Sequence, residues 1–357
     1  MPGFVSVIFG VLLFSLLIFV HELGHFLAAK AFGVQVNEFS MFMGPAIFKK
    51  KKGDTLYTIR CIPIGGFCAM EGEDQDTDNP RSFQKAAWWK RLIILVAGSV
   101  MNLITGVLLF SIVYAPAKEV AVPVISEFSQ CCTFDGPEGL QLGDELYSVD
   151  GHRVYTTSNV LLLFSLNDTG VHDITVVRDG QKVHFEDLHM AHSCTDEEGN
   201  DYSHYGLSWG VAQEATFARK VKAVWYTTLE NARTVWLSLQ MLLSGKVGLS
   251  EMAGPVGIVD MMSDAASAAP SFLDALLNLL YFGGFLAVNL GLMNLLPIPA
   301  LDGGRVVALL LTKAVEKITK KKIDSKYEGY VHGVGMILLL ALMALIMFKD
   351  IFVIFKG

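Results

Sequence analysis

The chain of 357 residues is 52% hydrophobic and only 18% charged, a composition too apolar for an ordinary soluble enzyme of this length. The net charge of −7 comes mostly from one acid-rich segment, so it does not indicate a nucleic-acid partner. No phosphate-binding glycine loop or nucleic-acid-binding motif is present in the sequence. A membrane protein is therefore the favoured class.

Four uncharged stretches are each close to, or longer than, the roughly 20 residues that cross a hydrocarbon core about 30 Å thick. They cover residues 4–20, 92–117, 275–301 and 329–348. The first stretch lacks the basic region and the small-residue cleavage site of a signal peptide. We therefore predict a polytopic α-helical membrane protein with about four transmembrane helices.

The distribution of positive charge predicts the orientation of these helices. Lysines cluster at residues 49–52 and 320–322, in the loop between the first two stretches and the loop before the last. Such positively charged loops stay on the cytoplasmic side of a membrane. The long segment from 118 to 270 and both termini are then expected outside the cytoplasm.

The sequence HELGH at residues 21–25 directly follows the first apolar stretch, where ionisable side chains are costly and indicate function. His21 and His25 are four residues apart, so on a helix they share one face and can hold one metal ion. Zinc accepts two imidazoles and leaves positions for a carboxylate and a water. Glu22, rotated by about 100° from His21, is placed to act as a general base toward that water.

The segment 55–70, TLYTIRCIPIGGFCAM, predicts a β-hairpin. Tyr57, Ile59 and Cys61 alternate with residues of the other face, and Gly65-Gly66 allows a turn. Ile59 and Cys61 are then expected on an open strand edge that pairs with an unwound substrate segment. A hairpin that merely covers the cytoplasmic loop fits the same pattern.

The segment 118–212 predicts a soluble domain with two hairpins. Asp150-Gly151 and Asp179-Gly180 are hairpin-turn pairs flanked by strand-like residues. The segment resembles a PDZ domain in its glycine-leucine, glycine-aspartate and aspartate-glycine pattern, and this resemblance implies an α/β fold with a peptide-binding groove. A small β-domain that only separates the membrane parts is the alternative.

Apolar residues recur with helical spacing from 218 to 243, including Val221, Trp225 and Leu239, and they predict an amphipathic helix. This helix could lie on the membrane surface or pack against the preceding domain. Four histidines and Cys194, between residues 184 and 204, match no spacing of a zinc site. We expect them in solvated loops, and we assign no role to the five cysteines.

A third metal ligand is expected at the end of the third apolar stretch, in NLLPIPALDGGR. Pro297 and Pro299 interrupt the helix, and the freed backbone groups must face protein or a wet cavity. Asp302 follows near the cytoplasmic end of its span, and His21 lies about 26 Å along the first helix. The two residues therefore reach the same depth. A turn aspartate before two glycines is the alternative reading of Asp302.

Together, HELGH, NLLPIPALDGG and the intervening PDZ-like domain resemble the site-two protease family, peptidase family M50, and specifically the RseP-type intramembrane zinc metalloproteases of bacteria. The resemblance covers essentially the whole chain. It implies one zinc ion bound by His21, His25 and Asp302, with Glu22 as the catalytic acid and base. This sequence departs from the enterobacterial pattern of the family in having one PDZ-like domain rather than two.

The same resemblance implies further site residues, of which Asn102, Asn294, Pro297 and Pro299 are the predicted substrate-binding ones. AGSVMN matches the glycine and asparagine of the family's second span, here Gly98 and Asn102. Asn294, Pro297 and Pro299 match the family segment that receives substrate, and a membrane-associated β-loop is implied for residues 55–70.

We predict an intramembrane zinc endopeptidase that cleaves single-span membrane proteins in regulated intramembrane proteolysis, in a bacterial inner or plasma membrane. Family resemblance suggests anti-sigma factors and remnant signal peptides as substrates. The alternatives are a membrane-anchored zinc protease that cuts loops outside the bilayer, and a non-catalytic PDZ scaffold. The predicted parts are the catalytic core at 1–117 and 271–357, the PDZ-like domain at 118–212, and an amphipathic connection at 213–270.

Overall fold

The computed structural model describes residues 3–73, 77–128, 139–167, 169–190, 192–195, 201–245, 254–320 and 326–356. These residues fall into two compact units. Met1–Val113 and Asn231–Gly357 belong to the first unit, and Tyr114–Glu230 to the second. The first unit therefore joins the two ends of the chain, which contain HELGH and NLLPIPALDGG.

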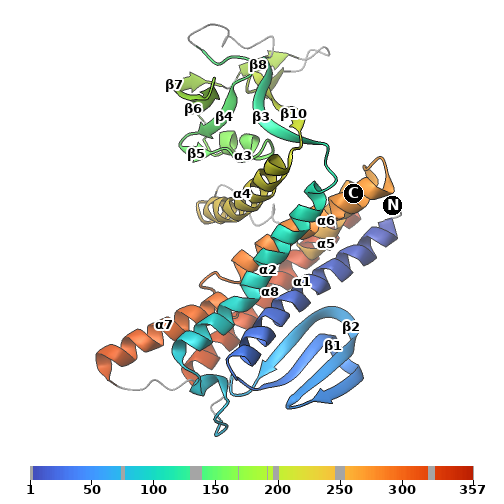
Figure 1. The fold of residues 1–357 in the computed structure, drawn as a ribbon, viewed down its shortest axis with the longest axis vertical. Helices are drawn as coiled ribbons and strands as arrows, with labels where there is room; N and C mark the ends of the chain where they lie inside the picture. Colours follow the sequence, from blue (N-terminus) through green and yellow to red (C-terminus); the bar gives the residue numbers. More distant parts are fainter. Residues whose placement is uncertain are drawn as a thin grey trace. The chain divides into compact units, whose positions relative to one another are not determined.

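Long helices dominate the first unit (Figure 1). They are α1 (Gly3–Ala31), α2 (Trp88–Tyr114), α5 (Pro255–Ser267), α6 (Phe272–Met293), α7 (Asp302–Thr319) and α8 (Lys326–Lys356), and α4 (Phe217–Leu243) continues from the second unit. Among the described residues, three helices are long and apolar enough to cross a membrane, in α1, α2 and α6. The predicted membrane protein with an additional β region is thereby confirmed.

The predicted fourth span, at 329–348, falls within α8. Its described apolar part, Gly333–Lys349, is shorter than a full span, so a fourth crossing remains a prediction. The basic stretch after Asp302 was expected to be a loop, but residues Asp302–Thr319 form the helix α7. The regular apolar spacing within this basic stretch accounts for the helix.

Two apolar cores flank the histidines along α1, and they hold this helix against its neighbours. The first core joins α1, α5 and α6 through Leu13, Leu17, Met262, Ala266, Ala275, Leu279, Leu286 and Ala287. The second joins the end of α1 to α2, α7 and a small sheet through Ala29, Val34, Val36, Phe39, Cys68, Met70, Phe83, Ile94, Leu95 and Leu309. His21 and His25 lie between these cores, at a fixed place on a packed helix.

The small sheet consists of β1 (Val36–Lys52) and β2 (Thr55–Met70). The turn between them is at Gly53, where φ is 62°, and Lys52 pairs with Thr55 across it. The chain also reverses direction within β2, between Ile59 and Gly66, and Gly65 there has a φ of 73°, which agrees with the turn predicted at Gly65-Gly66. The turn at Gly53 was not predicted, because the sequence analysis did not identify the strand β1.

The sheet folds back on itself, so that the first part of β1 lies between the two parts of β2. Glu38 pairs with both Ala69 and Leu56. Ile59 pairs with both Met41 and Phe48, so it is an internal position and the predicted open edge at Ile59 is wrong.

Two segments of this sheet pair on one side only among the described residues, and they form its edges. One edge, at 49–52, consists of four lysines, which discourage further strand pairing. The other, at 66–70, carries no charged side chain. The open edge is therefore at 66–70.

The bend of this sheet packs against α1. The hydroxyl of Ser15, which is buried, donates a hydrogen bond of 2.7 Å to the carbonyl oxygen of Pro63. Ser15 precedes His21 by six residues, which corresponds to about 9 Å along the helix. The sheet therefore lies beside an apolar helix, close to the histidines along its axis.

The second unit contains an antiparallel sheet with the strand order β10–β3–β4–β6–β7, and β5 pairs with β4. The elements of the second unit are β3 (Glu119–Phe128), β4 (Glu145–Val149), β5 (His152–Arg153), α3 (Asn159–Ser165), β6 (Val171–Arg178), β7 (Gln181–His189), β8 (His192–Thr195), β9 (Asp201–His204) and β10 (Leu207–Glu214). Strands β8 and β9 pair with each other in a separate two-stranded sheet. Asp150-Gly151 and Asp179-Gly180 form the predicted hairpin turns, with positive φ at all four residues.

Most of the predicted histidine cluster lies outside the described side chains. Those of His192, Cys194 and His204 are not described. His184 and His189 are exposed, but they lie on the strand β7 and not in a loop. Cys131 and Cys132 also lie outside the described residues.

Candidate active site

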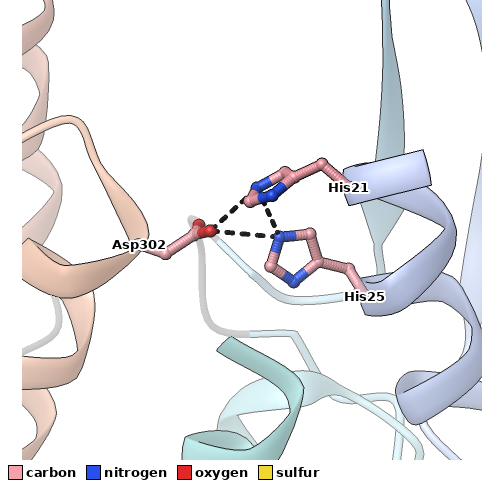
Figure 2. Close-up of side chains that lie close together, drawn as sticks. All are labelled: His21, His25 and Asp302. Carbon is pink, nitrogen blue, oxygen red and sulfur yellow. Dashed lines mark hydrogen bonds and ion pairs between the residues drawn. The ribbon is translucent and has the colours of Figure 1, made fainter. Parts of the chain in front are cut away.

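The two histidines of HELGH point from the same face of α1 toward one carboxylate (Figure 2). Their side chains are buried, with exposed fractions of 8% for His21 and 6% for His25. The four-residue spacing produces this arrangement, because residues i and i+4 lie one above the other on a helix. Burial removes the hydrogen bonds that the two imidazoles would make to water, so they require a polar partner within the protein.

That partner is Asp302. Its Oδ2 atom lies 3.0 Å from Nε2 of His21 and 3.2 Å from Nε2 of His25, and the two nitrogen atoms are 3.1 Å apart (Figure 2). Among the described residues, these three form the group of His, Cys, Asp and Glu side chains whose ligand atoms converge closely enough to hold a metal ion. Sequence reasoning had predicted this set.

The outer nitrogen of His25 is fixed by the backbone of α2. Nδ1 of His25 lies 2.8 Å from the carbonyl oxygen of Ile94, so the ring donates its Nδ1 proton there. Its Nε2 lone pair is then free and faces Asp302. Two lone-pair donors and an ionised carboxylate that converge in a buried place repel one another unless a cation lies between them. The donor set therefore fits a zinc ion.

A sharp turn between α6 and α7 directs Asp302 toward α1. Helix α6 ends at Met293, and the amide of Gly303 donates a 2.7 Å hydrogen bond to the carbonyl oxygen of Asn294. Ala300 adopts a φ of 81°, which is strained for a residue with a side chain. Asp302 is the first residue of α7, yet its side chain faces the histidines (Figure 2).

Gly98 on α2 provides the space that the imidazoles occupy. A Cβ atom at this position would overlap Nε2 of His25 and lie 2.8 Å from Cε1 of His21. Only a residue without a side chain fits at this position, which explains why the AGSVMN segment has a glycine there. The helices α1 and α2 therefore approach closely at the candidate metal site.

A cavity of about 310 Å³ opens beside the cluster. It is lined by Phe14, Ile18, His21, Glu22, Asn102, Leu290, Asn294, Ala300, Leu301 and Asp302. The amide nitrogens of Asn102 and Asn294 lie 3.4 Å and 3.5 Å from Nδ1 of His21. The structure thus brings both predicted asparagines and Glu22 to the same cavity.

The other predicted substrate-binding residues lie elsewhere. Pro297 and Pro299 belong to the turn between α6 and α7 and do not line this cavity. Ile59 and Cys61 are exposed on β2 and do not line it either.

Sequence reasoning missed the segment that does lie close to Glu22. Burial raises the pKa of the Cys68 thiol, and the nearby carboxylates of Glu22 and Glu73 raise it further. Cys68 belongs to the edge 66–70 and lies in the apolar core against which Leu23 packs, so this edge lies against the part of α1 that carries the candidate catalytic glutamate. Glu73 also pairs with Arg305 of α7. No pattern in the sequence indicated these contacts. The one related feature is Arg305, the basic residue that follows LDGG.

A buried cluster of two imidazoles and a carboxylate, on an apolar helix and next to a glutamate in HExxH, is characteristic of a membrane-embedded metalloenzyme. The family model described as "Peptidase family M50" matches residues 9–342. The chain belongs to this family, and it is a membrane-bound zinc metalloendopeptidase.

Similar proteins have related names and align along nearly their whole length. A Clostridium acetobutylicum protein named as a candidate zinc metalloprotease is 32% identical over 352 residues, covering 98% of both chains. A Clostridium perfringens protein with a name of the same kind is 32% identical over 351 residues, covering 97% of this chain and 98% of its own. The "Regulator of sigma-W protease RasP" of Bacillus subtilis is 26% identical over 434 residues, with the same coverage.

Proposed function

We propose that this chain is an intramembrane zinc endopeptidase that cleaves the transmembrane segments of single-span membrane proteins. The observation that supports this most is the position of the metal-binding group. His21 and His25 lie within Ile8–Ala31, a helix apolar and long enough to cross a membrane. A protease that acts on soluble loops has no need to place its site within such a helix.

In this proposal, His21, His25 and Asp302 hold the zinc ion. Bound there, zinc polarises the scissile carbonyl and makes water a stronger nucleophile. Glu22 takes the proton from the attacking water and passes it to the leaving amine. Glu22 lines the same cavity as His21 and Asp302, which places it within reach of a substrate bound there.

Asn102 and Asn294 orient His21 in the proposed mechanism. Oδ1 of Asn102 is buried and has no hydrogen-bond partner among the described residues, while its Nδ2 lies 3.4 Å from Nδ1 of His21. Oxygen and nitrogen of the amide can exchange places without a change of shape. In the exchanged form, Oδ1 accepts the Nδ1 proton and leaves Nε2 of His21 free for the metal.

We assign the substrate strand to the edge 66–70 rather than to Ile59 and Cys61. A helical substrate hides its scissile carbonyl in internal hydrogen bonds, so it must unwind before cleavage. An unwound segment can add as a further strand to an open sheet edge. The edge 66–70 is open, and its Cys68 lies in the apolar core against which Leu23, the residue after Glu22, packs, which supports this assignment. The turn with Pro297 and Pro299 directly precedes Asp302 in sequence and would border the same path.

The proposed topology follows the distribution of charge. The lysines of 49–52 and those that follow α7 lie in the cytoplasm, and both termini and the second unit lie outside. Helix α8 would supply a fourth span, and the location would be a bacterial inner or plasma membrane. The second unit would be a PDZ-like domain that binds a peptide segment, supported by its two hairpins and antiparallel sheet.

The name of the Bacillus subtilis relative points to regulation of a sigma factor. We therefore place anti-sigma factors and remnant signal peptides first among the substrate classes to be tested, cut after another protease has removed their outer part. Two alternatives are distinguishable from this proposal. A membrane-anchored protease would cut loops outside the bilayer, and a PDZ scaffold would cut nothing.

The test uses the full-length chain reconstituted in lipid vesicles with a single-span reporter protein. Wild type and Glu22→Gln are compared, and the cut is located by mass spectrometry of the products. We expect wild type to cut within the apolar segment and Glu22→Gln to be inactive with its zinc retained. A cut confined to the flanking loops, or equal turnover by both proteins, would overturn the proposal.

A further inference from the structure

An ion pair fastens the end of the edge strand to α7. Nη1 of Arg305 on α7 pairs with Oε1 of Glu73, across 232 positions of sequence. The side chains are only 24% and 20% exposed, so the pair is largely shielded from water. The two segments that it joins are the two borders of the candidate active site.

The first border is the edge strand and its continuation. Cys68 on this strand belongs to the apolar core against which Leu23 of α1, the residue after Glu22, packs, and Glu73 follows Cys68 by five residues. The continuation is held in place by two further bonds. Phe83 donates from its amide to the carbonyl oxygen of Glu71 at 2.7 Å, and Gln84 donates from Nε2 to that of Glu73 at 3.2 Å.

The second border is the turn that presents Asp302. Arg305 follows Asp302 by three residues on α7, and residues three apart are neighbours on a helix surface. Arg305 is therefore anchored on the same helical turn as Asp302, and a segment that pairs with Arg305 is held at a set distance from Asp302. The planar guanidinium group fixes direction as well as distance when it pairs with a carboxylate, which an ammonium group does less well.

We propose that Glu73 and Arg305 form a latch that holds the edge strand 66–70 at a fixed distance from Asp302, so that an unwound substrate segment fits between them. This inference rests on the proposed function, and both residues are positioning residues in it. Removal of one partner takes away the ion pair that joins the two segments, and the loss of a shielded pair disrupts geometry more than the loss of an exposed pair.

The experiment compares Glu73→Gln, Arg305→Gln, Arg305→Lys and the charge exchange Glu73→Arg/Arg305→Glu in the full-length protein. Asp54→Asn is the matched control, because Asp54 also forms an ion pair with an arginine, Arg81, at 2.8 Å, but both partners are about half exposed. The first readout is the rate at which N-ethylmaleimide labels Cys68, measured on its peptide by mass spectrometry. Cleavage kinetics and bound zinc are measured on the same preparations.

We expect Cys68, which is buried in wild type, to be labelled about tenfold faster in Glu73→Gln and Arg305→Gln. KM for the reporter should rise by about the same factor, with kcat and bound zinc close to wild type. The charge exchange should restore slow labelling and a lower KM, Arg305→Lys should be intermediate, and Asp54→Asn should match wild type.

Unchanged labelling of Cys68 in both Glu73→Gln and Arg305→Gln would overturn the latch. A charge-exchange variant whose labelling rate and KM are as high as those of the single variants would also overturn it. A single variant that loses its fold leaves the test to Arg305→Lys and the charge exchange. If wild type fails to cleave the reporter, the proposed function fails, but the labelling rates still decide whether the latch exists.

Discussion

Nδ1 of His25 lies 2.8 Å from the carbonyl oxygen of Ile94, and this contact ties the candidate metal site to the packing of α1 against α2. The hydrogen bond selects the ring form in which Nε2 is free, and Nε2 lies 3.2 Å from Oδ2 of Asp302. The geometry of the site therefore depends on α2, although α2 supplies no ligand. Substitutions on α2 should reveal this dependence.

Gly98→Ala should damage the metal site. The new methyl group would overlap the ring of His25, and neither imidazole can move away without losing Asp302. We expect zinc affinity and cleavage to fall by about 10- to 100-fold, measured by competition with a chelator and by reporter turnover. Gly333→Ala is the control, because the same change in α8 meets no described atom within 4 Å. Equal behaviour of the two variants would contradict the steric role of Gly98.

Asn102→Leu should weaken zinc binding by about 10- to 100-fold, because Nδ1 of His21 loses the group that sets its ring form. Ser99→Ala is the control on the same helix. The Ser99 hydroxyl is buried and has no hydrogen-bond partner in the described part of the chain, so its removal should cost little. Chelator competition distinguishes the two variants. Equal zinc affinity in Asn102→Leu and wild type would show that Asn102 serves another purpose.

Proline placed on the edge 66–70 should block substrate pairing. Successive backbone N–H groups of a strand point alternately toward the neighbouring strand and away from it. Among Phe67→Pro, Cys68→Pro and Ala69→Pro, those whose lost N–H points away should keep zinc but lose cleavage. Lys50→Pro, on the lysine edge, should retain both. Undiminished cleavage by every edge variant that keeps its zinc would argue against strand addition.

Acid should weaken the β1–β2 sheet through Glu38. Burial alone would raise the pKa of Glu38, but hydrogen bonds from Arg60 and Thr58, each 2.7 Å long, outweigh it and lower the pKa below 4.5. Because the pKa of Glu38 is lower in the folded state than in the unfolded state, its ion pair with Arg60 stabilises the fold. The full stabilisation is present at pH values above the ordinary pKa of a glutamate. That stability is lost as the pH falls through the folded pKa.

Thermal unfolding in detergent, followed from neutral pH down to about pH 3, tests this prediction. Wild type should lose more stability over this range than Glu38→Gln, which has no proton to gain at this position. Parallel curves for the two proteins would show that the Glu38 pair contributes nothing to the pH dependence.

The convergence of His21, His25 and Asp302 was predictable from the sequence because its geometry is local or follows from membrane depth. The spacing of His21 and His25 places them on one helical face, and Asp302 follows a helix break at the same depth. The two hairpin turns of the second unit were predictable for a similar reason. An aspartate-glycine pair fixes the turn by its own backbone preference.

The contacts that depend on partners distant in sequence were not predictable. Alternation marked Tyr57, Ile59 and Cys61 as a strand, but alternation does not say which strand pairs with it, so the open edge was misplaced. The pair of Glu73 and Arg305 joins residues 232 positions apart, and single charged residues are too common to indicate such a pair.

Elemental analysis of the purified protein tests the central claim most directly. Wild type and Glu22→Gln should each contain about one zinc ion per chain, whereas Asp302→Ala should contain almost none and should not cleave the reporter. If Asp302→Ala retains both its zinc and its activity, then His21, His25 and Asp302 do not form the metal site, and the proposed zinc mechanism is wrong.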